Sequence, residues 1–291
     1  MTTCVSVLKL TLSRTCLSLM HPRLLTTLIL LDPVIMSPQK SSRDEAFRVA
    51  RMSTWRRDLW PSQGEAVKGF RKSKFYASWD PRVLDRWLHY SLRNLPTVIY
   101  PNSAAGDKRV MLKTTKHQEV YTFLRPNFEG FETGQFDAKN HADMEPEAAS
   151  DLPFVRPESL EVSRRLPNLR PSIMYIFGGD SDMSTPERRK TIMDMTGVGV
   201  GGSGGAKAGR VKEVVLEGTS HLVPMEAVGQ CADSAAQWIG TELKRWNAEE
   251  EEFRTMWAQK SLIEKTTIDD KWREMIGGPP EYVKAPAESK L

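Results

Sequence analysis

The side chains best suited to acid–base chemistry follow two predicted strands in the second half of the chain. Asp180 and Asp182 come shortly after the apolar run 173–177, and His221 comes shortly after the segment 211–216. A histidine base and a carboxylate that orients it are two of the three residues of a Ser-His-Asp catalytic triad, in which the histidine takes the proton of the nucleophile. A plainer interpretation also exists, because aspartates at strand ends cap helices and a histidine in a loop is often merely solvated. Spacing alone leaves both interpretations open.

Alternating strands and helices predict a parallel sheet beneath these residues. The segments 173–177 and 211–216 are short and bounded by glycine-containing turns, which is typical of strands. The segment 173–177 is also continuously apolar, which is typical of a buried strand. Thr185-Pro186-Glu187 opens a helix after the first run, and residues 224–246 form a long helix after the second. Strand, helix, strand, helix implies parallel strands joined by right-handed crossovers. Catalytic groups gather at the carboxyl ends of such strands, where the candidate acid and base lie.

The first 36 residues predict a further piece of the same core, a helix followed by a strand. The apolar run 24–31 ends in Asp32-Pro33, and a continuous run of this length predicts a strand buried on both faces. It would be the third strand of the sheet. Charged residues interrupt the segment, so no stretch of about 18 uncharged residues predicts a membrane span. An amphipathic targeting peptide is the competing interpretation of this segment.

The remaining residues fall into three zones by composition. Residues 37–168 are rich in Trp and Arg and show apolar residues at helical spacing, which predicts a helical cap or lid. Residues 169–247 form the C-terminal part of the core, and residues 248–291 a charged helical tail. An apolar substrate would suit the tryptophans of the cap, although core packing explains them equally well. These tryptophans are Trp55, Trp60, Trp79 and Trp87.

The residues around the candidate acid and base resemble the α/β-hydrolase superfamily. In that family the acid follows a G-x-x-D turn and the base lies in a G-x-x-H loop before the final helix. Gly179-Asp180-Ser181-Asp182 and Gly218-Thr219-Ser220-His221 match both patterns, about forty residues apart. His21-Pro22-Arg23-Leu24, which runs on into Asp32-Pro33-Val34, is similar to the segment that leads into the cap of these proteins. The resemblance is to fungal hydrolases that include peroxisomal proteins of host-selective toxin biosynthesis.

This resemblance implies a fold, an activity and a set of site residues. The fold would be α/β, the C-terminal part of a hydrolase with a parallel sheet flanked by helices and an inserted helical cap. The activity would be hydrolysis of an ester, a thioester or a similar carbonyl of a small apolar substrate, through a serine acyl-enzyme and without a cofactor. His221 would be the base and Asp182 its orienting acid, with Asp180 as the alternative acid. Peroxisomal secondary-metabolite (toxin) biosynthesis is the implied setting.

The nucleophile of the family has no recognisable counterpart. Its serine lies in G-x-S-x-G on a strained strand-to-helix turn, which family spacing would place near residues 5–10. Val5-Ser6-Val7-Leu8-Lys9-Leu10 stands there without either glycine. The only formal match to the motif, residues 201–205, belongs to the glycine-rich segment and follows a helix instead of a strand. Ser6 is therefore a poor candidate, and Ser203, the only serine between two glycines, lies in a different context. The nucleophile is not identified.

These absences lead to two hypotheses about function. The first is an N-terminally truncated α/β-hydrolase that lacks activity of its own. The second is a non-catalytic remnant, or a cap protein that binds a ligand or a partner. Labelling by a fluorophosphonate that depends on His221 would favour the enzyme.

Composition and the other motifs support neither nucleic-acid, nucleotide nor metal binding. The net charge of +4 over 291 residues is small, and no Lys/Arg run supports nucleic-acid binding. The glycine-rich segment 197–205 contains formal G-x-G-x-x-G matches, but it follows a helix instead of a strand. Three distant cysteines predict no disulfide framework, and no Cys/His cluster has metal-ligand spacing. We expect a reducing compartment.

The final tripeptide, Ser289-Lys290-Leu291, matches the peroxisomal address. It predicts localisation in the peroxisome, with the import receptor as a partner.

Overall fold

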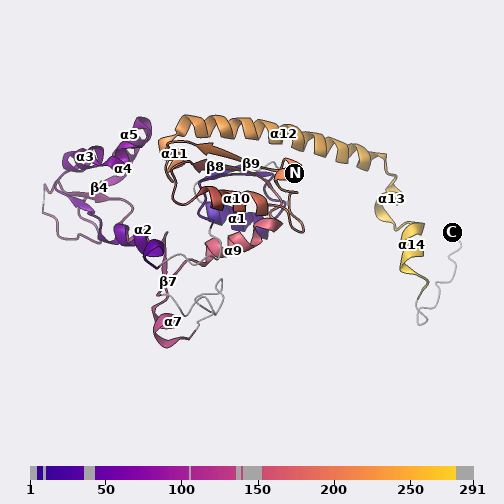
Figure 1. The fold of residues 1–291 in the computed structure, drawn as a ribbon, viewed down its shortest axis with the longest axis horizontal. Helices are drawn as coiled ribbons and strands as arrows, with labels where there is room; N and C mark the ends of the chain where they lie inside the picture. Colours follow the sequence, from indigo (N-terminus) through magenta and orange to yellow (C-terminus); the bar gives the residue numbers. More distant parts are fainter. Residues whose placement is uncertain are drawn as a thin grey trace. The chain divides into compact units, whose positions relative to one another are not determined.

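The computed structural model describes residues 5–8, 11–35, 43–104, 106–135, 139 and 153–279, with the backbone alone at 5–8, 11–12, 43–46 and 157. Its elements are labelled in Figure 1. Contacts divide the chain into two units, residues 1–240 and residues 241–291, and each is described by itself.

A parallel sheet forms the centre of the first unit. Its strands are β1 (Val5–Leu8), β2 (Thr27–Leu31), β8 (Ser172–Gly178) and β9 (Val211–Leu216), in that order across the sheet. All three pairings are parallel. Every residue of β2 and β8 is buried, as expected for central strands with helices on both faces.

The sequence predicted three of these four strands and missed β1. The run of β1 is only four residues long and has no glycine or proline at its ends, so it carries no local strand signal. Its strand state is a consequence of pairing, because all four residues are in register with β2, from Val5 opposite Thr27 to Leu8 opposite Leu30.

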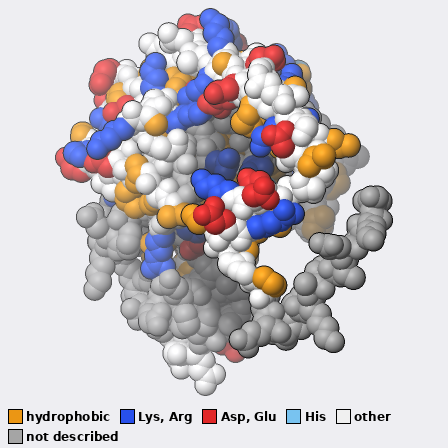
Figure 2. All heavy atoms as spheres, turned by 90° about the vertical axis from the view of Figure 1, so that its right-hand side faces the viewer, with side chains coloured by type: hydrophobic (Ala, Val, Ile, Leu, Met, Phe, Trp, Pro, Cys, Tyr) orange, Lys and Arg blue, Asp and Glu red, His pale blue; other side chains and the backbone are white. Residues whose placement is uncertain are grey.

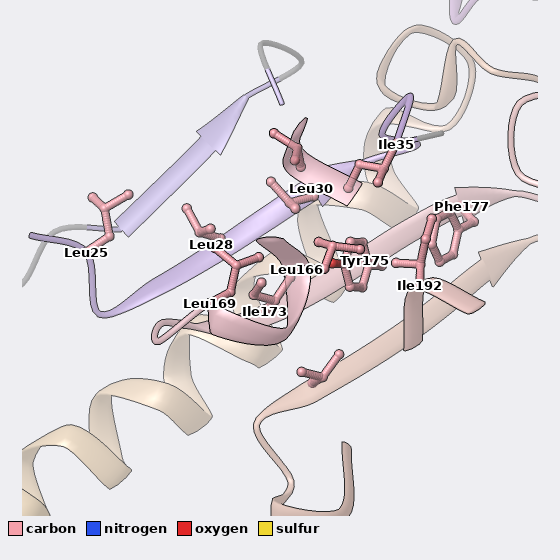
Figure 3. Close-up of a cluster of buried hydrophobic side chains, with 12 residues drawn as sticks. Leu25, Leu28, Leu30, Ile35, Leu166, Leu169, Ile173, Tyr175, Phe177 and Ile192 are labelled. Atoms are coloured by element: carbon pink, nitrogen blue, oxygen red, sulfur yellow. The ribbon is translucent and has the colours of Figure 1, made fainter. Parts of the chain in front are cut away.

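One face of the sheet packs against α1 (Thr11–Met20), α9 (Pro157–Arg165) and α10 (Pro186–Met195). Figure 3 shows the buried side chains of this cluster. The rings of Tyr175 and Phe177 are fully buried there and stack with their centroids 5.4 Å apart. The Tyr175 hydroxyl is bonded to the Thr196 hydroxyl at 2.9 Å, so this buried polar atom has a partner.

The other face packs against α11 (Val223–Glu226) and the first part of α12 (Val228–Gln259). Cys231, Ala235 and Trp238 lie at helical spacing and cover Met174 and Ile176 of β8. The Trp238 indole donates a hydrogen bond of 2.8 Å to the Thr27 hydroxyl. Helices on both faces of a parallel sheet confirm the α/β class predicted from the sequence.

The region predicted to be a helical cap contains short strands as well as helices. Its helices are α2 (Arg43–Trp55), α3 (Gln63–Lys72), α4 (Lys74–Ala77), α5 (Pro81–Tyr90), α6 (Lys116–Val120) and α7 (Phe128–Thr133). Its strands are β3 (Leu59–Trp60), β4 (Leu92–Asn94) and β5 (Val110–Leu112), which form an antiparallel sheet, and the pair β6 (Arg125–Pro126) and β7 (Phe154–Val155). Strands of two or three residues are too short to show an alternating pattern in the sequence.

Most of the cap tryptophans belong to a hydrophobic core. Trp60 and Trp79 are buried and Trp87 packs against the same cluster, in which its ring meets that of Phe70 edge to face. Trp55, in contrast, is 83% exposed at the end of α2. Core packing therefore explains three of the four tryptophans without a substrate.

The second unit consists of the rest of α12 followed by α13 (Leu262–Thr266) and α14 (Asp270–Ile276). Large apolar side chains are exposed on it, including Trp257, whose ring stacks on that of Phe253. Figure 2 shows Lys and Arg interspersed with Asp and Glu over one face of the molecule. Among the described helices, none is both long and apolar enough to cross a membrane.

Candidate active site

The carboxyl ends of β2, β8 and β9 bring three segments to one edge of the sheet. Asp32 follows β2, Gly178 is the last residue of β8, and the loop 217–222 that contains His221 follows β9. The strands are parallel and adjacent, so these segments meet although more than a hundred residues separate the first from the others.

His221 is bonded to a buried carboxylate at this edge. Its Nδ1 lies 2.7 Å from Oδ2 of Asp32, whose side chain is fully buried, while the His221 side chain is 32% exposed. When Nδ1–H donates to the carboxylate, the other ring nitrogen, Nε2, carries the lone pair. A histidine held in this way can act as a general base at Nε2, where the carboxylate would fix its tautomer and stabilise the imidazolium that forms.

Asp32 has an uncommon backbone conformation. Its φ angle is +41°, in the left-handed region that few residues other than glycine adopt, although aspartate tolerates it better than most. Its amide donates to the carbonyl of Ile176 at 2.8 Å, which continues the pairing with β8 for one residue beyond β2. This turn directs the carboxylate across the end of β8 towards the His221 loop.

The loop after β8 supplies donors to Asp32 but does not supply the acid. The Ser181 hydroxyl donates to Oδ2 at 2.6 Å and the Ser184 hydroxyl donates to Oδ1 at 2.5 Å. The amide of Gly178 also donates to Oδ1, at 3.3 Å. A buried carboxylate needs such donors, because they replace the water it has lost.

The sequence predicted Asp182 as the acid that orients His221, but in the structure a different aspartate is bonded to His221. The Asp182 side chain is 60% exposed and forms an ion pair with Arg48 of α2. Asp180, the alternative acid, is exposed, and its amide donates to the carbonyl of Thr219. Neither is the residue bonded to His221, which contacts Asp32 instead. The physical reason is strand order: β2 lies next to β8, so a residue one position beyond β2 reaches the same place as the loop after β8.

A local signal for Asp32 was present in the sequence. Asp32-Pro33 stops a buried apolar run, as Asp180 does, and so it too ends a strand at the carboxyl edge. Spacing along the chain does not show which strands are neighbours, so this signal alone does not distinguish Asp32 from Asp180 as the partner of His221.

Glu226 anchors the loop that carries His221. Its carboxylate accepts hydrogen bonds from the amide of Ser220 at 2.7 Å and from the hydroxyl of Ser220 at 2.5 Å. The hydroxyl of Ser78, from the cap region, donates to the same carboxylate at 3.3 Å. An open cleft of about 510 Å³ lies beside this contact, lined by Ser78, Asp80, Gly218, Thr219 and Glu226 together with the start of α12. The cleft borders both the cap region and the His221 loop.

Replacing Gly178 with alanine is expected to move the His221 loop. A Cβ at this position would lie 2.3 Å from the carbonyl oxygen of Ser220 and 2.5 Å from that of Thr219, and both are backbone atoms. We expect a loss of about 1–3 kcal/mol in the free energy of unfolding, measured by urea titration, because the loop must shift to relieve the overlap. Gly229→Ala is the matched control, since a Cβ there meets no atom within 4 Å. Equal stability of the two variants would contradict the close packing of β8 against this loop.

The structure places the two serines considered as nucleophiles away from His221. Ser6 pairs with Leu28, four residues before Asp32, a distance of about 13 Å along a strand. Its side chain is outside the described part of the structure, as are residues 9–10, which join β1 to α1. Ser203 donates its amide to the carbonyl of Leu169, which precedes β8, so it lies at the opposite edge of the sheet. No serine in the described side chains is therefore assigned as the nucleophile.

The glycine-rich segment 197–205 is a hydrogen-bonded turn at that same opposite edge. The amide of Gly197 donates to the carbonyl of Leu166, and that of Gly204 donates to the carbonyl of Gly197. A Cβ at Gly202 would lie 2.4 Å from the Gly197 carbonyl oxygen, so close backbone packing accounts for the glycine there. As for metals, the described residues contain no group of three or more His, Cys, Asp or Glu that could hold an ion.

The parallel sheet with helices on both faces has the α/β-hydrolase fold. The peroxisomal α/β-hydrolase Lpx1 of Saccharomyces cerevisiae has the same fold, with a TM-score of 0.52 over 87% of this chain and 60% of that one. The sequence identity is 14%, so the likeness concerns the fold alone. A search of protein-family models found no match.

Sequence relatives agree with the fold. The chain is 37% identical over 281 residues to the type I acyl-CoA thioesterase mpaH of Penicillium roqueforti, a match that covers 91% of this chain and 63% of that protein. The corresponding thioesterase of Penicillium brevicompactum is 34% identical, with 62% of its length covered. The abhydrolase domain-containing protein ACTT2-1 of Alternaria alternata is 26% identical over 89% of this chain and 91% of its own.

These similarities confirm the resemblance to α/β-hydrolases that the sequence predicted. The chain has the α/β-hydrolase fold and is similar to fungal proteins named as thioesterases and abhydrolase domain-containing proteins. It spans less than two-thirds of the length of the two thioesterases.

Proposed function

We propose that this protein hydrolyses an acyl thioester or a related ester, with His221 as the general base and Asp32 as the carboxylate that orients it. The hydrogen bond of 2.7 Å between the partly exposed ring and the buried acid carries this proposal. The names of the relatives, type I acyl-CoA thioesterases, support a thioester as the substrate class.

In the proposed reaction His221 moves one proton twice. Its Nε2 takes the proton of the attacking hydroxyl or water as the oxygen forms a bond to the carbonyl carbon. The imidazolium is stabilised by Asp32 and then gives the proton to the departing sulfur or oxygen as the carbon–sulfur or carbon–oxygen bond breaks. A serine nucleophile would add an acyl-enzyme stage, whereas direct attack by water would complete the hydrolysis in one stage.

The test is hydrolysis of acyl-CoA and p-nitrophenyl esters of several chain lengths by the 291-residue chain and its His221→Gln variant. We expect turnover by the wild type and a loss of at least about a hundredfold in the variant, because the general base is gone. His89→Gln, which replaces an exposed histidine of α5, is the control and should retain activity. Equal rates in the wild type and His221→Gln, or no turnover by either, would overturn the proposal. Fluorophosphonate labelling that depends on His221 would identify a serine nucleophile.

The lack of a G-x-S-x-G motif at residues 5–10, where the family places its nucleophile, favours a second candidate, a non-catalytic protein that binds an acyl ligand. In that case an acyl-CoA would raise the melting temperature of the chain without being hydrolysed. Turnover that depends on His221 would exclude this candidate.

We also propose that Ser289-Lys290-Leu291 directs the protein to peroxisomes, through the import receptor that recognises this tripeptide. These residues lie outside the described part of the structure. A fluorescent protein fused ahead of the last residues of the chain should enter peroxisomes, and deletion of Leu291 should abolish import. Unchanged localisation after the deletion would refute the proposal.

A further inference from the structure

Two serines of the loop after β8 hold both oxygens of the buried Asp32 carboxylate. The Ser181 hydroxyl donates to Oδ2, the oxygen that also faces His221, and the Ser184 hydroxyl donates to Oδ1. The amide of Gly178 is the second donor to Oδ1. Each carboxylate oxygen therefore has two partners.

The loop backbone orients the first of these serines. The Ser181 hydroxyl oxygen accepts a hydrogen bond of 3.2 Å from the amide of Met183, so its own proton is free to point at Asp32. Ser181 and Ser184 are themselves buried. A hydroxyl has only one proton to donate, and in both serines that proton is used on Asp32.

These contacts oppose rotation of the Asp32 carboxylate about its bond to Cβ. If the carboxyl plane turned, Oδ2 would leave both Ser181 and His221, and Oδ1 would leave Ser184 and the Gly178 amide. Since the site is buried, no water would replace these donors, and each unpaired group would cost free energy. The serines thus resist any motion that takes Oδ2 away from Nδ1 of His221.

We propose that Ser181 and Ser184 are positioning residues that hold Asp32 so that His221 stays in its Nδ1–H tautomer, with Nε2 as the base. The catalytic part of this inference rests on the proposed function, since the tautomer matters for turnover only if His221 is the base. The arrangement itself is a property of the free protein and is measurable without a substrate.

The experiment is ¹⁵N and proton NMR of the full 291-residue chain labelled at its five histidines, with the His221 signals assigned by comparison with His221→Gln. In the wild type we expect Nδ1 protonated, Nε2 unprotonated, and a downfield proton resonance for the bond to Asp32. In the Ser181→Ala, Ser184→Ala double variant that resonance should be lost and the nitrogen shifts should report a mixture of tautomers.

The control variants separate positioning from general stability. Ser18→Ala removes another buried hydroxyl, which donates to the carbonyl of Arg14 within α1, and should leave the His221 signals unchanged. Ser181→Thr keeps the hydroxyl and should retain the downfield resonance. If the double variant does not fold, the single alanine variants test the inference instead. Each of them should show a weakened downfield resonance of the bond between His221 and Asp32. Wild-type His221 signals in folded alanine variants would overturn the inference.

A kinetic measurement connects the positioning to turnover. Each single alanine variant should lower kcat by about ten- to hundredfold, the effect of one lost hydrogen bond to a charged group, with little change in KM. Because the NMR measurement needs no turnover, an inactive chain with an intact His221 signal would reject the proposed function alone. An active chain whose alanine variants keep both the signal and kcat would reject this inference alone.

Discussion

Asp32→Asn is expected to lower hydrolysis by about 10³–10⁴-fold, the scale of effect when the carboxylate behind a catalytic histidine is made neutral. The asparagine side chain has nearly the same size but only one acceptor oxygen. Ser181 and Ser184 donate to different oxygens of Asp32, and His221 donates to the one that Ser181 also contacts. The NH₂ group of asparagine must therefore face one of these donors, and where it faces Nδ1 it forces His221 into the wrong tautomer.

The matched variant is Asp182→Asn, which replaces the acid predicted from the sequence. Its carboxylate is exposed and pairs with Arg48, and exposed ion pairs contribute only about 0–1 kcal/mol. We expect hydrolysis within about twofold of the wild type, since the side chain has no contact with His221 among the described residues. The measurement is kcat/KM of Asp182→Asn, Asp32→Asn and the wild type on the same thioester. A greater loss in Asp182→Asn than in Asp32→Asn would return the role of the acid to Asp182.

Phe177→Ala is expected to destabilise the protein by about 3–5 kcal/mol, as for other large-to-small changes at fully buried aromatic residues. The ring is 0% exposed, stacks on Tyr175, and belongs to the cluster between the sheet and its helices in Figure 3. Truncation would leave a cavity between the strand and α10, whose Ile192 packs in the same cluster. The free energy of unfolding from urea titration measures the change.

Val200→Ala is the control for this core substitution. Val200 is 93% exposed in the glycine-rich turn, and such surface changes usually stay within about 0.5 kcal/mol. A destabilisation by Phe177→Ala as small as that of Val200→Ala would contradict the packing of this face of the sheet. Because Phe177 precedes Gly178, whose amide donates to Asp32, we also expect the core variant to weaken the His221 resonance.

Local patterns in the sequence were enough to predict most elements of the core. The continuous apolar runs that became β2 and β8 predicted buried strands, and the segment 211–216 between glycine-containing turns predicted β9. The long helix predicted over residues 224–246 contains Cys231, Ala235 and Trp238, which cover one face. His221 was predicted as a candidate base for the same reason, since a polar residue just after a parallel strand lies at the carboxyl edge. These features depend on residues within about ten positions of each other, so the sequence alone determined them.

Strand order was decided only in three dimensions, and it determined which carboxylate is bonded to His221. Asp32, Asp180 and Asp182 all follow buried strands, and nothing local distinguishes them. Insertion of β2 beside β8, across 145 residues of chain, carries Asp32 to Ser181, Ser184 and His221, while Asp182 remains in solvent with Arg48. Local sequence indicates most of the segments that become strands, whereas the burial of their apolar faces against one another determines which strands are neighbours. His221 was therefore evident from the sequence as a candidate base, but the carboxylate bonded to it was set by the tertiary structure.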